Sequence, residues 1–310
     1  MKNYILTILL LVTFMSRAQE KEYSIEEINI DPFVKGTLLT PSETYEGPLV
    51  VLLQGSGPTD RNGNQSLSKN DAIKKLALAF AEKGIASYRY DKRIFQADRL
   101  GIREKDMRFD DFIVDAKTVL DHFKEYPQFQ KLVIVGHSQG SLVGMIAARD
   151  RADAFISLAG LSQPVDSLIT QQITKQAPTL KESVQRSFQE MREKGSTKSY
   201  HPILESVFRP AAQPFLLSWM VYNPKKEIAK LDIPVLIVYG DKDLQVEEME
   251  AEELKAANPK ADLKMIEGMN HVLRKIEGDD LDNSKSYNEA HRPLHPELIE
   301  VLVDFIKNPE

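Results

Sequence analysis

From residue 20 onward, short apolar runs alternate with longer runs in which apolar residues recur every three or four positions. The short runs have β-strand character and the longer ones have helical periodicity. This alternation predicts an α/β fold with a mostly parallel central sheet and helices on both faces. Predicted strands lie at residues 23–30, 33–39, 48–54, 85–90, 131–136, 154–160, 234–240 and 261–266. Predicted helices lie at residues 69–82, from about residue 110, and at residues 141–149.

The first two predicted strands differ from the others, because only Asp31, Pro32 and a short turn separate them. We expect them to pair in an antiparallel way. The strand at 48–54 is a continuous apolar run up to its last residue, Gln54, which is typical of a strand buried on both faces of a sheet.

More than seventy residues separate the strands at 154–160 and 234–240, which is too long for a simple connection. The segment is rich in Gln, Lys, Glu and Ser, and Leu168, Ile173 and Leu180 stand at helical spacing. We predict a helical cap at residues 161–230, inserted into a core of residues 19–160 and 231–310. The cap is expected to lie over the carboxyl ends of the strands, where α/β sheets bind ligands. The alternative is a helical insertion of purely structural value.

The first eighteen residues differ from the rest of the chain. Lys2 precedes an apolar stretch at residues 4–15, and Ser16-Arg17-Ala18 places small residues at the −3 and −1 positions of a cleavage site. The apolar stretch is shorter than the roughly 20 residues that span a bilayer, which argues against the alternative of a membrane anchor. We predict a signal peptide at residues 1–18 and an exported protein, periplasmic or secreted, without a membrane anchor after cleavage.

Composition narrows the possible functions. The 310 residues include 40 Lys and Arg against 46 Asp and Glu, a net charge of −6, which argues against a nucleic-acid partner. Cysteine is absent. This excludes disulfides, thiolate zinc sites, iron–sulfur clusters and a cysteine nucleophile. We predict neither a cofactor nor a metal, and the sequence leaves the oligomeric state open.

The strongest chemical signal is Gly136-His137-Ser138-Gln139-Gly140, which fits the pattern G-x-S-x-G. It follows the predicted strand at 131–136 directly and precedes a predicted helix, which is the setting of a nucleophile elbow. Glycines suit the tight turn, and the helix N-terminus favours developing negative charge. We predict that Ser138 is the nucleophile. The alternative is a buried turn serine.

A serine hydroxyl needs a histidine base that is oriented by a carboxylate, and in this fold the chain order is Ser, acid, His. We predict His271 as the base, because it lies in a loop after the predicted strand at 261–266. The ring of His137 is expected to point away from Ser138. The remaining histidines are excluded by chain order or cap position, or are expected at the surface, and they are His122, His201, His291 and His295.

Two aspartates follow the strand at 234–240, and either can reach a histidine on the neighbouring loop. We prefer Asp243 as the acid, because Asp241 sits in the turn itself, where aspartates often bond only the local backbone. Asp166, after the previous strand, is a third candidate.

Acyl transfer also needs two N–H donors for the oxyanion. One is expected from the backbone of Gln139, and the other from the loop after the strand at 48–54, for which we predict Ser56. The glycines beside Ser56 are alternatively only turn residues. The pattern of a phosphate-binding loop is absent.

At these residues the chain resembles secreted α/β-hydrolases of the carboxylesterase and serine aminopeptidase-like group, over about residues 23–307. Further shared motifs are GSGPTDRNGN at 55–64, YRYDKR at 88–93, the acid loop YGDKD ending at 243, and GMNH at 268–271. The resemblance implies the α/β-hydrolase fold with a helical cap. Two positions depart from the common family form, since Gln54 replaces a histidine and Ile94 replaces a glycine.

Six basic residues crowd the segment 92–108, and they are Lys92, Arg93, Arg99, Arg103, Lys105 and Arg108. Loops after strands open onto the active-site face, so this segment is a candidate for attracting an anionic substrate group. The alternative is a solvated loop of mixed charge.

The sequence therefore predicts a serine hydrolase that cleaves carboxylic esters of small to medium acyl size through an acyl-enzyme intermediate. A peptidase or amidase of the same fold is the second interpretation. An inactive, hydrolase-like binding protein is the third.

Overall fold

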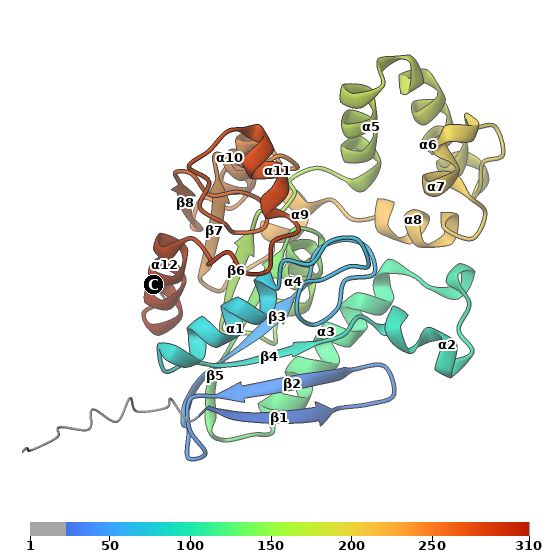
Figure 1. Ribbon diagram of the computed structural model, residues 1–310. Coiled ribbons are helices and arrows are strands. Elements are labelled where there is room, and N and C mark those ends of the chain that lie inside the picture. The colour runs from blue at the N-terminus through green and yellow to red at the C-terminus, as the bar shows by residue number, and fades with distance from the viewer. Residues whose placement is uncertain (1–22, 310) are drawn as a thin grey trace, which may run out of the picture.

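The computed structural model describes residues 23–309. The predicted signal peptide, residues 1–18, lies outside the described residues. An eight-stranded sheet forms the centre, with helices packed on both faces (Figure 1). The strands are β1 (Ser24–Asn29), β2 (Lys35–Thr40), β3 (Gly47–Leu53), β4 (Ala86–Tyr90), β5 (Phe129–His137), β6 (Ala154–Leu158), β7 (Val235–Gly240) and β8 (Asp262–Ile266).

The strand order is β1-β2-β4-β3-β5-β6-β7-β8. Strand β2 pairs in an antiparallel way with both β1 and β4, and all the other pairs are parallel. The predicted antiparallel opening and mostly parallel sheet are therefore confirmed. Since β3 to β8 run in the same direction, the loops after their carboxyl ends meet at one edge of the sheet, where the candidate site lies.

The helices connect the parallel strands and extend the chain beyond them. They are α1 (Ala72–Glu82), α2 (Ala97–Leu100), α3 (Phe109–Lys124), α4 (Gln139–Ala148), α5 (Val165–Gln176), α6 (Lys181–Lys194), α7 (Glu205–Phe208), α8 (Gln213–Met220), α9 (Pro224–Ile228), α10 (Glu248–Ala257), α11 (Asp280–Ser286) and α12 (Pro296–Lys307).

The two faces of the sheet bury separate hydrophobic clusters, because successive side chains of a strand point to opposite faces. In β3, Val50 and Leu52 pack with residues of α1 and α12, whereas Leu49, Val51 and Leu53 pack with residues of α3, α4 and α10. All five side chains are buried, as predicted for a strand covered on both sides.

Helix α12 is absent from the sequence-based prediction, which assigned a polar segment with surface histidines near its start. Its buried residues nevertheless recur at helical spacing, and they are Leu298, Leu302, Phe305 and Ile306. Helices α10 and α11 were also not predicted. They are short and polar, so their periodicity is weak.

The chain between β6 and β7 contains helices and loops but no strand, and Figure 1 shows α5 to α8 grouped apart from the sheet. These helices enclose a small hydrophobic cluster of their own, formed by Val184, Phe188, Met191, Leu204, Phe208 and Leu216. Among residues 23–309, no helix is long and apolar enough to cross a membrane.

Candidate active site

Ser138 lies at a sharp turn between β5 and α4. Its backbone has φ 53° and ψ −120°, in the left-handed half of conformational space that a serine rarely adopts. The turn is packed so tightly that only glycine fits beside it, since a Cβ on Gly140 would lie 2.6 Å from the carbonyl oxygens of Leu53 and Gln54. A Cβ on Gly136 would meet the backbone of Gly140. The local sequence thus produces the predicted elbow geometry for a steric reason.

Two backbone N–H groups beside this turn have no acceptor. Gln139 is the first residue of α4, and Ser56 lies in the loop after β3. In the part of the chain that the structure describes, neither backbone N–H donates a hydrogen bond. Unpaired donors at a helix start and on the adjacent loop are suited to binding an anionic oxygen.

Hydrogen bonds from Lys92 hold the loop that carries Ser56. The Lys92 side chain is buried and its ammonium donates to the carbonyl oxygens of Gly55 and Gly57, the latter at 3.1 Å, and to Oε1 of Gln139 at 2.8 Å. Burial lowers the pKa of Lys92 to about 7. The three oxygen acceptors oppose this effect, because each N–H of the ammonium has a partner.

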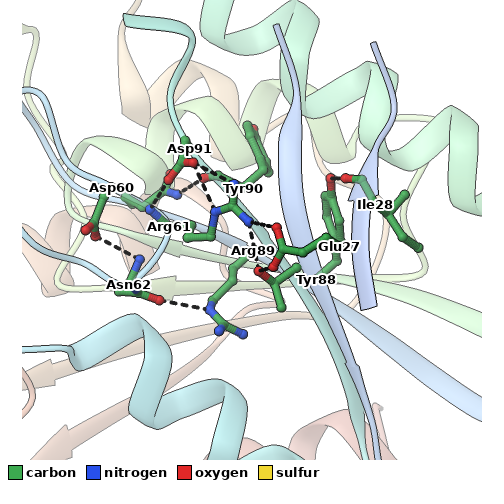
Figure 2. Close-up of polar contacts among 11 residues, drawn as sticks. Glu27, Ile28, Asp60, Arg61, Asn62, Tyr88, Arg89, Tyr90 and Asp91 are labelled. Carbon is green, nitrogen blue, oxygen red and sulfur yellow. Dashed lines mark hydrogen bonds and ion pairs between the residues drawn. The ribbon is translucent and has the colours of Figure 1, made fainter. Parts of the chain in front are cut away.

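The same loop is fastened further along by Arg61 (Figure 2). The Arg61 backbone N–H donates to Asp91 Oδ1 at 2.9 Å, and its guanidinium donates to Asp91 Oδ2 at 2.7 and 3.0 Å. Arg61 also contacts Glu27 and Thr37, and Asn62 accepts a hydrogen bond from Arg89 at 3.3 Å. The two motifs at 55–64 and 88–93, far apart in sequence, therefore form one hydrogen-bonded unit.

Gln54 and Ile94, the two residues that depart from the family form, lie beside these two motifs. The Gln54 side chain donates to the carbonyl oxygen of Tyr90, so it joins the ends of β3 and β4. Ile94 lies in a short 3-10 helix, Arg93–Gln96, and lines an apolar cavity.

His271 contacts one of the three candidate acids. Its Nδ1 lies 2.7 Å from Oδ2 of Asp243, and both side chains are buried. Burial by itself would raise the pKa of Asp243, but His271 and the backbone N–H groups of Gln245 and Val246 outweigh burial and hold the pKa below its usual value. Asp243 is therefore ionised beside the imidazole.

The other two aspartates serve other purposes. Asp241 accepts the backbone N–H of Gly268 at 2.5 Å, so it joins the acid loop to the loop of His271. Asp166 lies in α5 and pairs with Arg192 of α6. Neither of them contacts His271.

Two asparagines that sequence reasoning missed hold the acid and histidine loops together. Asn283 in α11 donates to the carbonyl oxygen of Lys242 at 2.7 Å and accepts from the side chain of Asn270 at 2.9 Å. Asn270 precedes His271 and also bonds the backbone N–H of Arg274 at 2.9 Å. The GMNH motif contained Asn270 as a signal, whereas Asn283 lies in a helix that was not predicted.

His137 belongs to the site, although its ring was expected to point away from Ser138. Its Nε2–H donates to the carbonyl oxygen of His271 at 2.8 Å, and the two imidazole centroids lie 4.8 Å apart. Burial, and to a lesser degree the nearby His271, lowers the pKa of His137 to about 3. His137 is thus a neutral imidazole that fixes the backbone of His271.

The remaining histidines lie elsewhere. His122 is in α3, and His201 and His291 are exposed. The expectation that His295 lies at the surface is wrong, because it is buried with its Nε2–H donating to the carbonyl oxygen of Glu267 at 3.1 Å. The neighbouring prolines had suggested a surface loop, but His295 directly precedes the first residue of α12.

The basic segment 92–108 does not gather its charges into one cationic surface. Lys92 and Arg93 are buried, and Arg93 pairs with Asp115 and Asp111. The other four basic residues are exposed, and of these Arg103 pairs with Asp106. The alternative of a mixed-charge loop describes these exposed residues better than an anion-binding site.

Ser138 and His271 open into the same cavity of about 380 Å³, which Ser56 and His137 also line. The structure thus brings together three predicted site residues from three separate loops, Ser56, Ser138 and His271, and places His137 beside them. Within residues 23–309, no group of three or more His, Asp or Glu side chains is arranged to hold a metal ion.

Comparisons with known proteins show which proteins this chain is similar to. The Esterase EstD of Thermotoga maritima is 27% identical over 284 residues, which cover 86% of this chain and 66% of that esterase. The chain therefore spans just under two thirds of the length of this curated relative.

Solved structures with similar folds include two esterases and a peptidase. Est1E from Butyrivibrio proteoclasticus has a TM-score of 0.56 at 18% identity, covering 91% of this chain and 96% of its own. The Pyrococcus furiosus esterase Pf2001 has a TM-score of 0.55 at 16% identity, with 93% and 91% covered. The Pyrococcus horikoshii acylaminoacyl peptidase has a TM-score of 0.54 at 15% identity, with 94% and 42% covered. These neighbours confirm the predicted α/β-hydrolase fold.

A family model described as serine aminopeptidase, S33, matches residues 68–277, a range that includes Ser138, Asp243 and His271. The match covers well over half of the chain. The chain therefore belongs to the serine aminopeptidase S33 family of α/β-hydrolases.

Proposed function

We propose that this protein is a serine hydrolase that cleaves carboxylic esters through an acyl-enzyme intermediate. The observation that carries the proposal is the 2.7 Å contact between His271 Nδ1 and Asp243 Oδ2, at the wall of the cavity that Ser138 also lines. A histidine held by a buried carboxylate, a serine on a strained turn and two unpaired N–H donors are the parts that acyl transfer needs.

In the first half of the reaction, Ser138 Oγ attacks the ester carbonyl carbon while Nε2 of His271 takes the hydroxyl proton. The carbonyl oxygen becomes an oxyanion and accepts hydrogen bonds from the N–H groups of Ser56 and Gln139. The intermediate then collapses, and the bond to the alcohol oxygen breaks. His271 gives its proton to this oxygen, so the alcohol leaves and the acyl group stays on Ser138.

Water completes the reaction. His271 takes a proton from water, and the resulting hydroxide attacks the acyl carbon. The second oxyanion is held by the same two donors, and the proton returns from His271 to Oγ as the acid leaves. Ester and water are thereby converted into alcohol and carboxylic acid.

Asp243 acts through the histidine. Its carboxylate accepts the Nδ1–H of His271, which leaves Nε2 unprotonated and able to take the serine proton. As His271 becomes positively charged in the transition state, the ionised Asp243 stabilises that charge.

A peptidase or amidase is the second candidate, and the family name together with the acylaminoacyl peptidase neighbour supports it. The same groups serve amide cleavage, with His271 protonating a leaving amine. We rank ester cleavage first, because the curated relative is an esterase and because the chain between β6 and β7 is only a group of short helices, without a large second domain to select peptides.

The proposal is tested by measuring kcat/KM for p-nitrophenyl esters of increasing acyl length beside aminoacyl-anilides. We expect the esters to be cleaved at the higher rate. Faster cleavage of the anilides would assign the peptidase function. Absence of fluorophosphonate labelling at Ser138 in folded protein would leave the inactive, hydrolase-like binding protein.

We also propose that the protein is exported after cleavage before Gln19, on the basis of residues 1–18 alone. The mass of the protein recovered from the periplasm or medium tests this. An intact N-terminus in that fraction would contradict it.

A further inference from the structure

Two cavities meet at Ser56, and the first has a larger share of polar side chains in its wall than the second. The first has a volume of about 380 Å³ and contains Ser138 and His271. The second has a volume of about 370 Å³ and lies between the loops of the core and helix α8. Ser56 lines both cavities, whereas Gln139 lines only the second. A substrate that places its carbonyl at the two N–H donors therefore has space on either side.

Most of the residues that line the first cavity are polar and uncharged, and Ala72, Ile73 and Val272 add an apolar part. None of the residues that line it is Asp, Glu, Lys or Arg. Its hydrogen-bonding side chains, apart from the serine and the histidines already described, are Thr59, Gln65, Ser68, Asn70, Gln245 and Tyr287. Neutral donors and acceptors match hydroxyl groups, whereas a charged group would enter this cavity without a counter-charge.

The second cavity is mainly apolar and aromatic. Phe112 from α3 and Phe215 and Trp219 from α8 form part of its wall, with Phe112 and Phe215 centroids 5.5 Å apart and Phe215 and Trp219 centroids 6.1 Å apart. Its only two charged residues, Glu104 and Arg209, pair with each other. Such a wall stabilises an apolar group, and an aromatic ring gains further from packing against aromatic faces and edges.

The chemistry decides which end of the substrate enters each cavity. The alcohol oxygen must receive a proton from His271, so the alcohol lies in the first cavity, which His271 lines. The carbonyl oxygen must face the N–H groups of Ser56 and Gln139. The acyl group then extends past these donors into the second cavity.

We propose that the substrate is an ester that joins an apolar, aromatic carboxylic acid to a neutral, polyhydroxylated alcohol. This inference rests on the hydrolase function proposed above and adds the substrate class. It requires both halves of the ester to be recognised at once, because each cavity matches only one of them.

Four esters, which combine two acids with two alcohols of the same three-carbon skeleton, test the inference with the wild-type protein. The acid is acetic or 3-phenylpropanoic acid, and the alcohol is propanol or propane-1,2,3-triol esterified at a primary hydroxyl. We expect kcat/KM to rise about tenfold on exchanging acetyl for 3-phenylpropanoyl, from burial of the ring. A second rise, of about fivefold to tenfold, is expected on exchanging propyl for dihydroxypropyl, from two new hydrogen bonds.

Two variants test the acyl preference and the alcohol preference separately. Trp219→Leu should remove most of the acyl preference and leave the alcohol preference, whereas Gln245→Leu should do the reverse. Val221→Ala and Leu244→Ala are the matched controls, because both residues are exposed and line neither cavity. The controls should retain both preferences.

The possible failures are distinguishable. If propyl acetate is cleaved with a kcat/KM equal to or above that of dihydroxypropyl 3-phenylpropanoate, the substrate class is wrong and the hydrolase function stands. If fluorophosphonate labels Ser138 but none of the four esters is cleaved, the substrate class is again wrong. If Ser138 is neither labelled nor active, the proposed function itself fails.

The hydrogen bonds of Lys92 support a second inference, which does not depend on the two cavities. Its ammonium binds the carbonyl oxygens on both sides of Ser56 and the side chain of Gln139, so it contacts both segments that supply the unpaired N–H donors. Among the described residues Lys92 forms no ion pair, whereas its neighbour Arg93 is paired with Asp115. The geometry points to Lys92 as a positioning residue that fixes the two donors relative to each other.

This second inference also rests on the proposed function, and Lys92→Met tests it. We expect kcat for a small ester to fall about 10²-fold, as for loss of one oxyanion donor, with KM changed less than about threefold. The affinity for a boronic acid, which forms a tetrahedral anion on Ser138, should fall in parallel. Lys105→Met, in an exposed position of the same segment, is the control.

A merely structural lysine would reduce the amount of folded protein without changing the ratio of boronate affinity to KM. Unchanged kcat in folded Lys92→Met overturns the inference. If Lys92→Met does not fold, Gln139→Met tests the inference instead. This variant removes the side-chain acceptor of the Lys92 ammonium and keeps the backbone N–H of residue 139. Its kcat is expected to fall about tenfold, and an unchanged kcat would contradict the role of Lys92.

Discussion

The loops at the carboxyl ends of the strands and the helical segment between β6 and β7 are held in different ways. The loops are fixed by close backbone contacts with neighbouring elements, as where Gly140 at the start of α4 meets the carbonyl oxygens of Leu53 and Gln54. Buried side chains such as Lys92 and Asn283 also hydrogen-bond to them. The helical segment is held by a small apolar cluster of its own and by exposed ion pairs such as Arg209 with Glu104.

This difference separates the residues of the proposed catalytic site from the residues that line the proposed substrate space. Acyl transfer requires reacting atoms to be placed within fractions of an ångström, which backbone contacts achieve. Selectivity for an apolar group requires only a wall of suitable shape. We therefore expect changes in the loops to affect every substrate, and changes in the helices to affect mainly the choice among substrates.

The largest effect should come from removing the reacting groups themselves. Ser138→Ala and His271→Ala are each expected to lower kcat by a factor of about 10⁴ to 10⁶ for all esters, because members of a triad act as a unit. Circular dichroism should show an intact fold. If either folded variant kept more than about a tenth of the wild-type kcat, the role assigned to that residue would be wrong.

The next effect distinguishes two aspartates two positions apart. Asp243→Asn should lower kcat by about 10⁴, because the amide favours the wrong tautomer of His271. Asp241→Asn should change kcat at most about tenfold, since its amide oxygen can still accept the N–H of Gly268. Both are measured with one p-nitrophenyl ester, and the reverse ranking would move the acid to Asp241.

A third change tests the helical segment. Phe188 is buried in its apolar cluster and lies edge-on to Phe208 with centroids 4.9 Å apart. Phe188→Ala should cost about 3 kcal/mol of stability, through the lost contact and the cavity left behind. If the helices only shape the substrate space, kcat for p-nitrophenyl acetate should stay within about threefold of wild type. A loss of kcat comparable to that of Asp243→Asn would show that the helical segment also positions the reacting groups.

The smallest expected effect is a pH dependence of the free energy of unfolding that arises from His137. His137 has its pKa lowered from 6.5 to about 3, so between these values the unfolded chain binds a proton that the folded chain does not. Stability should therefore fall as the pH drops below 6.5, by about 2 kcal/mol between pH 7 and pH 5.

Urea unfolding of wild type and His137→Gln at both pH values measures this contribution. The glutamine retains an N–H donor for the carbonyl oxygen of His271 but does not titrate, so its stability should depend less on pH by that amount. Equal pH dependence of the two proteins would show that His137 does not carry the effect.

Much of the fold was predictable from local patterns. The eight strands were found within a few residues of their observed bounds, because apolar runs flanked by turn residues are a local signal. Ser138 was predictable for the same reason, since an elbow requires small residues within five positions of one another. The choice of Asp243 followed from the turn chemistry after β7. Its contact with His271 is now seen directly.

The sequence by itself determined the order of strands and helices along the chain, the serine turn and the candidate partners, because each is encoded by neighbouring residues. Only the tertiary structure decided that Lys92 binds the carbonyl oxygens on both sides of Ser56, that His137 and Asn283 hold the loops of His271 and Asp243, and that two cavities meet at Ser56. These contacts join residues from different loops and helices. The spacing of residues along the chain gives no information about such contacts, since they arise from how parallel strands and their crossovers pack in space.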